Sequence, residues 1–315
     1  MRSVTFFLLL ALAAAALASD SSKQLSPSIR KSGSSAPSES SLRVDVSMAL
    51  VPVSVTDING RNVTGLRREN FRLLDDKQPR DIASFSREDQ PITVGLVFDC
   101  SRSMFDKFAV AREAPTELYR QLNEHDESFL ITISDRPSLR HVLTSNFEEL
   151  QNALFFTNPN GTTALLDGVY LGLTQIRKAR NPRRALIVVS DGGDNNSRYT
   201  LGELKKLATE SDAQIFAIGL HLNPATAEER DGPELLAALA RASGGIDYSV
   251  TSVNEIAGVM AKIGATLHNQ YVLGYYPPSN PQSGKYHRIT VQLMLPSYLP
   301  PLRIYARAGY YAPER

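Results

Sequence analysis

The sequence predicts an α/β protein in which a doubly wound, mostly parallel sheet is inserted into a small β-sandwich-like domain built from both flanks. Within residues 91–268, helical stretches alternate with apolar runs of strand length, namely ITVGLVF, SFLITIS, ALIVVS and AQIFAIGL. Strands that are apolar on both faces are typical of a parallel sheet with helices on each side. Residues 42–90 and 269–315, by contrast, have the alternation and turn residues of β structure.

The two flanks are predicted to fold together. LRVDVSMALVPVSVTD alternates as a half-buried strand does, and the following Asn59–Gly60 marks a turn. After the α/β unit, QYVLGYYPP, KYHRITVQLML and LRIYARAGYY are strand-like and are separated by Pro, Ser and Gly. Neither flank suffices for a sandwich alone, but together they supply about six strands. We therefore expect one β domain, with its first part in 42–90 and its second part in 269–315.

Three patterns predict helix starts by the capping box, in which Ser or Thr is followed three residues later by Glu. They lie at Ser145–Glu148, Thr200–Glu203 and Ser252–Glu255. Apolar side chains recur on one helical face after Ser252 and also after Thr163. We interpret these stripes as core-facing and assign no function to them.

The first 18 residues, MRSVTFFLLLALAAAALA, have the features of a secretory signal peptide. Their apolar stretch is short for a membrane span, although an uncleaved N-terminal anchor is the alternative. Residues 19–41 are rich in serine and lack aromatic residues, so we expect a disordered linker there. The sequence thus predicts a secreted or periplasmic protein with no membrane span after signal cleavage.

The composition excludes several classes of site. The chain has 315 residues and a formal net charge of +1, with no basic stripe, so no nucleic-acid partner is expected. The single cysteine, Cys100, excludes an intramolecular disulfide and a cysteine zinc cluster. The histidines show no ligand spacing and are interpreted as surface or packing residues. They are His125, His141, His221, His268 and His287.

Oxygen-bearing side chains follow the predicted parallel strands. VGLVFDCSRSM places Asp99, Ser101 and Ser103 at one strand exit, and ALIVVSDGGDN places Asp191 at another. Between them, the Gly-Thr-Thr loop 161–163 opens a helix. Ligands gather at the carboxyl ends of the strands in open α/β sheets, so the three segments are candidates to converge. Carboxylates and hydroxyls without imidazole or thiolate suit Mg²⁺, Mn²⁺ or Ca²⁺ and not zinc or copper.

This pattern resembles the metal-ion-dependent adhesion site (MIDAS) of von Willebrand factor type A (VWA) domains. DxSxS follows the first apolar strand, with GTT near residue 162 and SDG near 190 at the spacing of that family. The resemblance implies a Rossmann-like VWA domain over residues 91–268, with a six-stranded sheet and one antiparallel edge strand. It implies metal binding, direct or through water, by Asp99, Ser101, Ser103, Thr163 and Asp191, with Asp194 as a possible outer residue.

The flanks narrow the resemblance. Residues 42–312 are similar to the bacterial VWFA-related family known mostly from acidobacterial genomes, which implies export but has a poorly defined biochemical role. Two residues depart from the VWA pattern: Arg102 replaces a common Gly, and Cys100 replaces a small or polar residue. We expect Arg102 to point away from the metal and to lie on the rim that a partner meets, and Cys100 to be a small packing residue.

Alternatives to this interpretation include an ordinary helix-capping turn at Asp99–Ser103. A structural envelope protein with a vestigial metal site is another, and a Mg²⁺-dependent hydrolase is a third. The hydrolase lacks support, because Ser101 has no neighbouring histidine or G-x-S-x-G elbow, and there is no Walker A motif. We predict a non-enzymatic, exported, protein-binding module. Its ion, Mg²⁺ or else Mn²⁺ or Ca²⁺, is expected to take its last ligand from an Asp or Glu of the partner protein.

Overall fold

The computed structural model describes residues 48–312, except residues 88, 222–226, 279–283 and 297. For residues 227–230 it describes only the backbone. The predicted signal peptide (1–18) and Ser-rich linker (19–41) lie outside the described residues. Among the described residues, no helix combines the length and the apolarity needed to cross a membrane.

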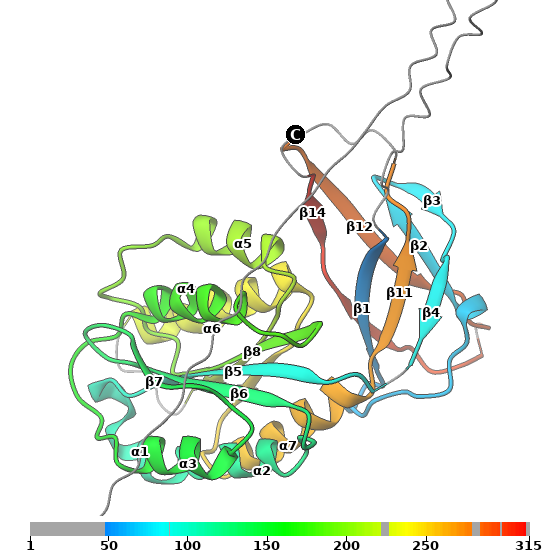
Figure 1. The fold of residues 1–315 in the computed structure, drawn as a ribbon. Helices are drawn as coiled ribbons and strands as arrows, with labels where there is room; N and C mark the ends of the chain where they lie inside the picture. Colours follow the sequence, from blue (N-terminus) through cyan, green and yellow to red (C-terminus); the bar gives the residue numbers. More distant parts are fainter. Residues whose placement is uncertain (1–47, 88, 222–226, 279–283, 297, 313–315) are drawn as a thin grey trace, which may run out of the picture. The chain divides into compact units, whose positions relative to one another are not determined.

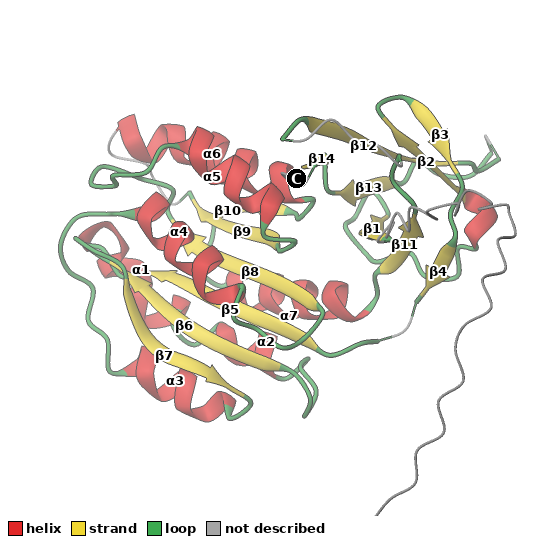
Figure 2. Cartoon of the chain, turned by 45° about the horizontal axis from the view of Figure 1, so that its top comes forward, coloured by secondary structure: helices red, strands yellow, loops and turns green. Residues whose placement is uncertain are grey.

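A six-stranded sheet forms the centre of the α/β part, in the order β10-β9-β8-β5-β6-β7 (Figures 1 and 2). Neighbouring strands are parallel except for the antiparallel edge pair β6 and β7. The strands are β5 Ile92–Asp99, β6 Glu127–Ile133, β7 Ser138–Thr144, β8 Arg183–Ser190, β9 Gln214–Leu220 and β10 Asp247–Val250. The predicted doubly wound, mostly parallel sheet is thus confirmed, including its antiparallel edge strand.

Helices cover both faces of this sheet (Figures 1 and 2). On one face lie α4 Leu165–Ile176, α5 Leu201–Glu210 and α6 Ala227–Ser243; on the other lie α1 Phe105–Ala111, α2 Pro115–Tyr119, α3 Phe147–Phe155 and α7 Glu255–His268. All residues of β5 are buried, and its side chains alternate between the two cores: Leu96 and Phe98 pack with α1 and α7, and Val97 packs with α4. This two-sided burial explains the continuous apolar runs of the sequence.

One of the three predicted capping boxes is confirmed. The Thr200 hydroxyl accepts a hydrogen bond from the Glu203 N–H at 3.3 Å, and the Glu203 carboxylate accepts one from the Thr200 N–H at 2.8 Å. The predictions at Ser145 and Ser252 are wrong. The N-cap residue of α3 is Asn146 and that of α7 is Asn254, and neither side chain makes a capping hydrogen bond. Before α7, the carbonyl of Ser252 accepts from the Glu255 N–H, so a backbone turn replaces the predicted cap.

Strands from both flanks form two further antiparallel sheets, in the orders β13-β1-β11-β4 and β14-β12-β2-β3. The strands are β1 Ala49–Thr56, β2 Phe71–Asp75, β3 Gln78–Arg80, β4 Ser84–Ser86, β11 Tyr271–Tyr275, β12 Tyr286–Leu293, β13 Arg303–Ala306 and β14 Gly309–Tyr311. The described flanks therefore hold eight strands instead of about six. Three of them span only three residues, too few for alternation to show. The predicted domain boundaries at 90/91 and 268/269 stay a prediction.

Candidate metal centre

Asp99 is the last residue of β5 and is fully buried. Its Oδ1 accepts a hydrogen bond from the Ser101 N–H at 2.8 Å, and its Oδ2 accepts one from the Ser190 hydroxyl at 2.6 Å. The first bond turns the chain sharply after the strand, and the second joins the exits of β5 and β8. The carboxylate is therefore fixed at the carboxyl edge of the sheet.

The turn after Asp99 brings two hydroxyls together. Ser101 Oγ and Ser103 Oγ lie 3.0 Å apart; Ser101 is buried, and Ser103 is partly exposed. Ser103 lies in the 3-10 turn η2 Arg102–Met104, which leads directly into α1. Neither Ser101 nor Met104 caps these helices with its side chain. The alternative of an ordinary capping turn therefore has no support at Ser101.

The Gly-Thr-Thr loop lies directly against this turn. The N–H of Asn160 donates to the carbonyl of Cys100 at 2.8 Å, and the N–H of Arg102 donates to the carbonyl of Gly161 at 3.1 Å. Thr163 is buried, and its N–H donates to Asn195 Oδ1 at 3.0 Å. These bonds bring the second and third predicted segments beside the first, because Asn195 belongs to the loop after β8.

Asp191, the first residue after β8, is 2% exposed. Its Oδ2 accepts a hydrogen bond from Lys107 Nζ in α1 at 3.0 Å. Its Oδ1 is buried and has no hydrogen-bond partner within the described part of the chain. A buried carboxylate oxygen without a partner is costly, and a cation bound there would remove that cost.

The charges of this cluster also favour a cation. Burial, and then the nearby carboxylate of Asp191, raise the pKa of Asp99 to about 6. Two buried carboxylates that repel each other are stabilised by a positive ion held between them. The set of carboxylates and hydroxyls therefore fits a hard divalent cation such as Mg²⁺.

The remaining predicted residues have distinct positions. Asp194 Oδ1 accepts from the Leu165 N–H at 2.9 Å and from the Ser197 hydroxyl at 2.6 Å, so it orders the start of α4 and its own loop. Arg102 is exposed. Cys100 is buried, its thiol lies 3.6 Å from the carbonyl of Phe98, and burial raises its pKa, as expected of a packing residue.

Two residues near Asp191 were missed by the sequence analysis. Lys107 was not considered as a site residue, although it lies only four residues after Ser103. His221 follows β9 directly, and the charges of Asp191 and Lys107 both act on its pKa, which burial lowers. The interpretation of His221 as a surface or packing residue did not place it near this cluster. Its place at a strand exit was the available signal.

Gly192 lets the loop after Asp191 pass close to α6. Its φ is +85°, and a Cβ there would lie 2.5 Å from Cα of Gly232.

We expect Gly192→Ala to lower the free energy of unfolding by about 2 kcal/mol, because a side chain is strained at this φ and clashes with backbone. Urea unfolding measures the change. Gly258→Ala is the control: Gly258 is in α7 with open space around it, so alanine should stabilise the helix by about 0.5–1 kcal/mol. Equal stability of Gly192→Ala and the wild type would contradict the close approach.

The fold and these loops define a class: an α/β domain with buried carboxylates and hydroxyls at the carboxyl edge of its sheet. Residues 94–193 match the family model of the von Willebrand factor type A domain. The chain thus contains a VWA domain, as the resemblance implied. The narrower similarity to the acidobacterial family stays a prediction. No curated protein matches the sequence.

Solved structures are similar to this chain at low identity, and the first of the three below has the same fold. Proximal thread matrix protein 1 from the mussel byssus, with a zinc-occupied MIDAS motif, aligns with a TM-score of 0.51 and 16% identity, over 62% of this chain and 50% of that chain. BatB from Bacteroides thetaiotaomicron aligns with a TM-score of 0.46 and 18% identity, over 56% of this chain and 98% of that chain. A von Willebrand factor type A protein from Catenulispora acidiphila aligns with a TM-score of 0.49 and 12% identity, over 83% of this chain and 74% of that chain.

Proposed function

We propose that the protein is an exported, non-enzymatic module that binds a partner protein through a divalent metal ion. One observation carries the proposal: the exits of β5 and β8 and the Gly-Thr-Thr loop are hydrogen-bonded into one cluster, which leaves Asp191 Oδ1 without a partner in the described chain. Proximal thread matrix protein 1, the solved neighbour with a zinc-occupied MIDAS motif, is compatible with metal binding at this cluster.

The ion that fits is Mg²⁺, with Mn²⁺ or Ca²⁺ as substitutes. Ser101, Ser103 and Thr163 would hold it by their hydroxyls, and Asp99 and Asp191 would bind directly or through water. When bound, the ion supplies an electrophilic centre that prefers an anionic oxygen over water. The chain's own residues would fix its position and leave one side open to a carboxylate of the partner.

The surface beside the cluster suits an acidic, partly apolar partner. Arg102 is exposed, and Phe105, two residues after Ser103, is 68% exposed. An exposed cation on the rim attracts acidic surfaces during encounter, and an exposed aromatic ring adds contact area. We therefore place the partner's Asp or Glu over the ion, with flanking contacts to Arg102 and Phe105.

Affinity capture tests the function. The immobilised protein is incubated with cell-envelope extract of its source organism in Mg²⁺, and in parallel with chelator. We expect a protein that is retained only in Mg²⁺ and that the Asp99→Asn variant fails to retain. Circular dichroism in chelator checks that the fold persists. A partner that is retained equally well by the variant or in chelator would contradict metal-dependent binding.

A second interpretation, a structural protein with a vestigial metal site, has one observation in its favour. The ammonium group of Lys107 already pairs with Asp191 at 3.0 Å and supplies part of the positive charge that an ion would bring. The two interpretations differ in whether Mg²⁺ raises the melting temperature of the wild type. A rise supports the binding module, and no rise up to millimolar Mg²⁺ supports the vestigial site.

A further inference from the structure

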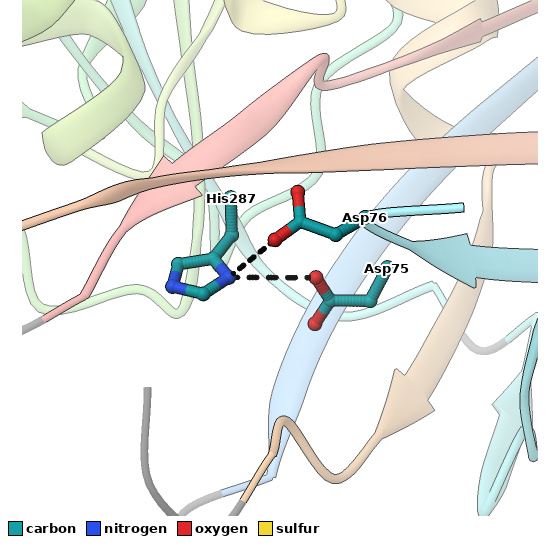
Figure 3. A group of neighbouring side chains, drawn as sticks. All are labelled: Asp75, Asp76 and His287. Carbon is teal, nitrogen blue, oxygen red and sulfur yellow. Dashed lines mark ion pairs between the residues drawn. The ribbon is translucent and has the colours of Figure 1, made fainter. Parts of the chain in front are cut away.

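A second cluster of ligand-type side chains lies in the sheet β14-β12-β2-β3, away from the VWA site. Asp75 ends β2, Asp76 begins the turn to β3, and His287 lies in β12, which pairs with β2 (Figure 3). From the sequence, His287 is interpreted as a surface or packing residue. That interpretation missed the cluster because the strand pairing brings together residues more than two hundred positions apart.

The distances between the candidate ligand atoms suit one ion. His287 Nδ1 lies 2.9 Å from Asp76 Oδ2 and 3.8 Å from Asp75 Oδ1, and all three atoms lie within 4.8 Å of one another. Zinc bonds of about 2.0–2.2 Å in tetrahedral geometry place neighbouring ligand atoms roughly 3.4 Å apart. Small shifts of the exposed Asp76 side chain would meet that requirement.

Two of the three side chains are buried, and each has at least one polar atom without a hydrogen-bond partner among the described residues. Asp75 is 1% exposed and His287 is 7% exposed. Among the residues described, Asp75 Oδ1 and His287 Nε2 have no hydrogen-bond partner, and the 2.9 Å contact of His287 Nδ1 with Asp76 Oδ2 is an ion pair without hydrogen-bond geometry. Buried polar atoms of this kind are uncommon in folded proteins and call for a ligand or an ion. Asp75 Oδ1 and His287 Nδ1 face each other, whereas His287 Nε2 lies on the far side of the ring (Figure 3).

The surrounding contacts hold the other carboxylate oxygens. Asp75 Oδ2 accepts hydrogen bonds from the hydroxyls of Tyr275 at 3.2 Å and Tyr310 at 3.1 Å. Burial and the charge of Asp75 raise the pKa of Tyr310 to about 12, so its hydroxyl stays a donor. Asp76 Oδ1 accepts from the Arg288 N–H at 2.9 Å, and the ring of Tyr310 stacks on His287. Each carboxylate thus has one oxygen held by hydrogen bonds and the other directed at His287 Nδ1. In metal sites, hydrogen bonds from surrounding residues orient the ligand side chains in the same way.

We propose that Asp75, Asp76 and His287 bind a zinc ion that fastens the β2–β3 turn to β12. An imidazole with two carboxylates suits zinc, whereas Mg²⁺ and Ca²⁺ prefer oxygen ligands alone. The carboxylate of Asp76 is 46% exposed and gives solvent access to the fourth position. This site is independent of the proposed function, since it uses another element, another donor set and another ion.

The proposal is tested by titrating zinc into the metal-free full chain in excess Mg²⁺ and measuring the binding by isothermal titration calorimetry. The Asp99→Asn background removes any zinc bound at the VWA cluster. We expect the Asp99→Asn protein to bind one equivalent of zinc. Adding His287→Gln to this protein should lower its zinc affinity at least tenfold. His141→Gln is the matched control, because His141 lies in β7 outside both clusters, where it contacts the exposed Glu149 at 3.2 Å and the carbonyl of Val142 at 2.8 Å. It should leave zinc affinity unchanged.

A further variant keeps the test decisive if His287→Gln does not fold. Asp76→Asn preserves the turn, because asparagine tolerates the φ of +49° found there, yet it removes one ligand charge. It should also lower zinc affinity at least tenfold, and X-ray absorption of the wild-type complex should show nitrogen from one imidazole. No binding in the Asp99→Asn background, or binding unaffected by Asp76→Asn, would overturn the site and leave an ion pair between His287 and the aspartates.

Discussion

In the Asp99→Asn variant, Mg²⁺ is expected to lose its stabilising effect on the fold. If the wild-type protein binds one Mg²⁺ ion, free Mg²⁺ at 100 times the dissociation constant adds about 2.7 kcal/mol to its free energy of unfolding. Asparagine keeps the size of Asp99 and can still accept from the Ser101 N–H, but it removes a charge that the ion requires. In chelator the variant should be about as stable as wild type. The substitution removes the cost of burying the Asp99 charge and its repulsion by Asp191, and this offsets the lost hydrogen bond from the Ser190 hydroxyl to Asp99 Oδ2.

Thermal unfolding with Mg²⁺ and with chelator measures this difference. Asp106→Asn is the control, because Asp106 is an exposed carboxylate in α1 close in sequence to the site. It should retain the full response to Mg²⁺. If Asp99→Asn melts with the same dependence on Mg²⁺ as wild type, Asp99 is not a ligand.

The Lys107→Met variant is expected to show the opposite behaviour. Methionine keeps the apolar stem but leaves Asp191 without its 3.0 Å ion pair, in a site where the two side chains are 14% and 2% exposed. Removing one partner of a buried pair is strongly destabilising, so we expect a loss of about 3 kcal/mol in chelator. Mg²⁺ should restore most of this loss, and it should bind more tightly than to wild type because it no longer competes with the ammonium group.

Urea unfolding of this variant in chelator and in Mg²⁺ measures both effects. Lys206→Met is the matched control, since Lys206 and Glu210 form an exposed pair at 3.8 Å whose loss should change stability by less than about 1 kcal/mol. A Lys107→Met protein that is unstable in chelator and is not rescued by Mg²⁺ would favour the vestigial site.

The α/β fold and the position of the candidate site were predictable because their signals are local. β5 is buried on both faces, so its apolar run is continuous and ends visibly at Asp99. The serines follow within the same turn, and Asp191 follows β8 in the same way. Position at the carboxyl end of a parallel strand then suffices to bring these segments together, without knowledge of any side-chain contact.

The contacts that were missed depend on long-range packing. Lys107 is one of several polar residues in α1, and only the packing of α1 against the sheet shows that it reaches Asp191. The facing of His287 and Asp75 depends on the register of β12 and β2, in which Ile289 lies opposite Asp75. Short edge strands such as β3 and β14 owe their form to their neighbours, so sequence alternation does not reveal them.

The mixing of the two flanks within each β sheet has a consequence for biosynthesis. A chain leaves the ribosome with its N-terminus first, yet β1 pairs with β11 and β13, which are translated after the entire α/β part. β1 must therefore wait with its backbone groups unpaired by these strands while more than two hundred residues are made. Ribosome-stalled chains that end before residue 271 should contain a protease-resistant α/β unit and a protease-sensitive β1 segment.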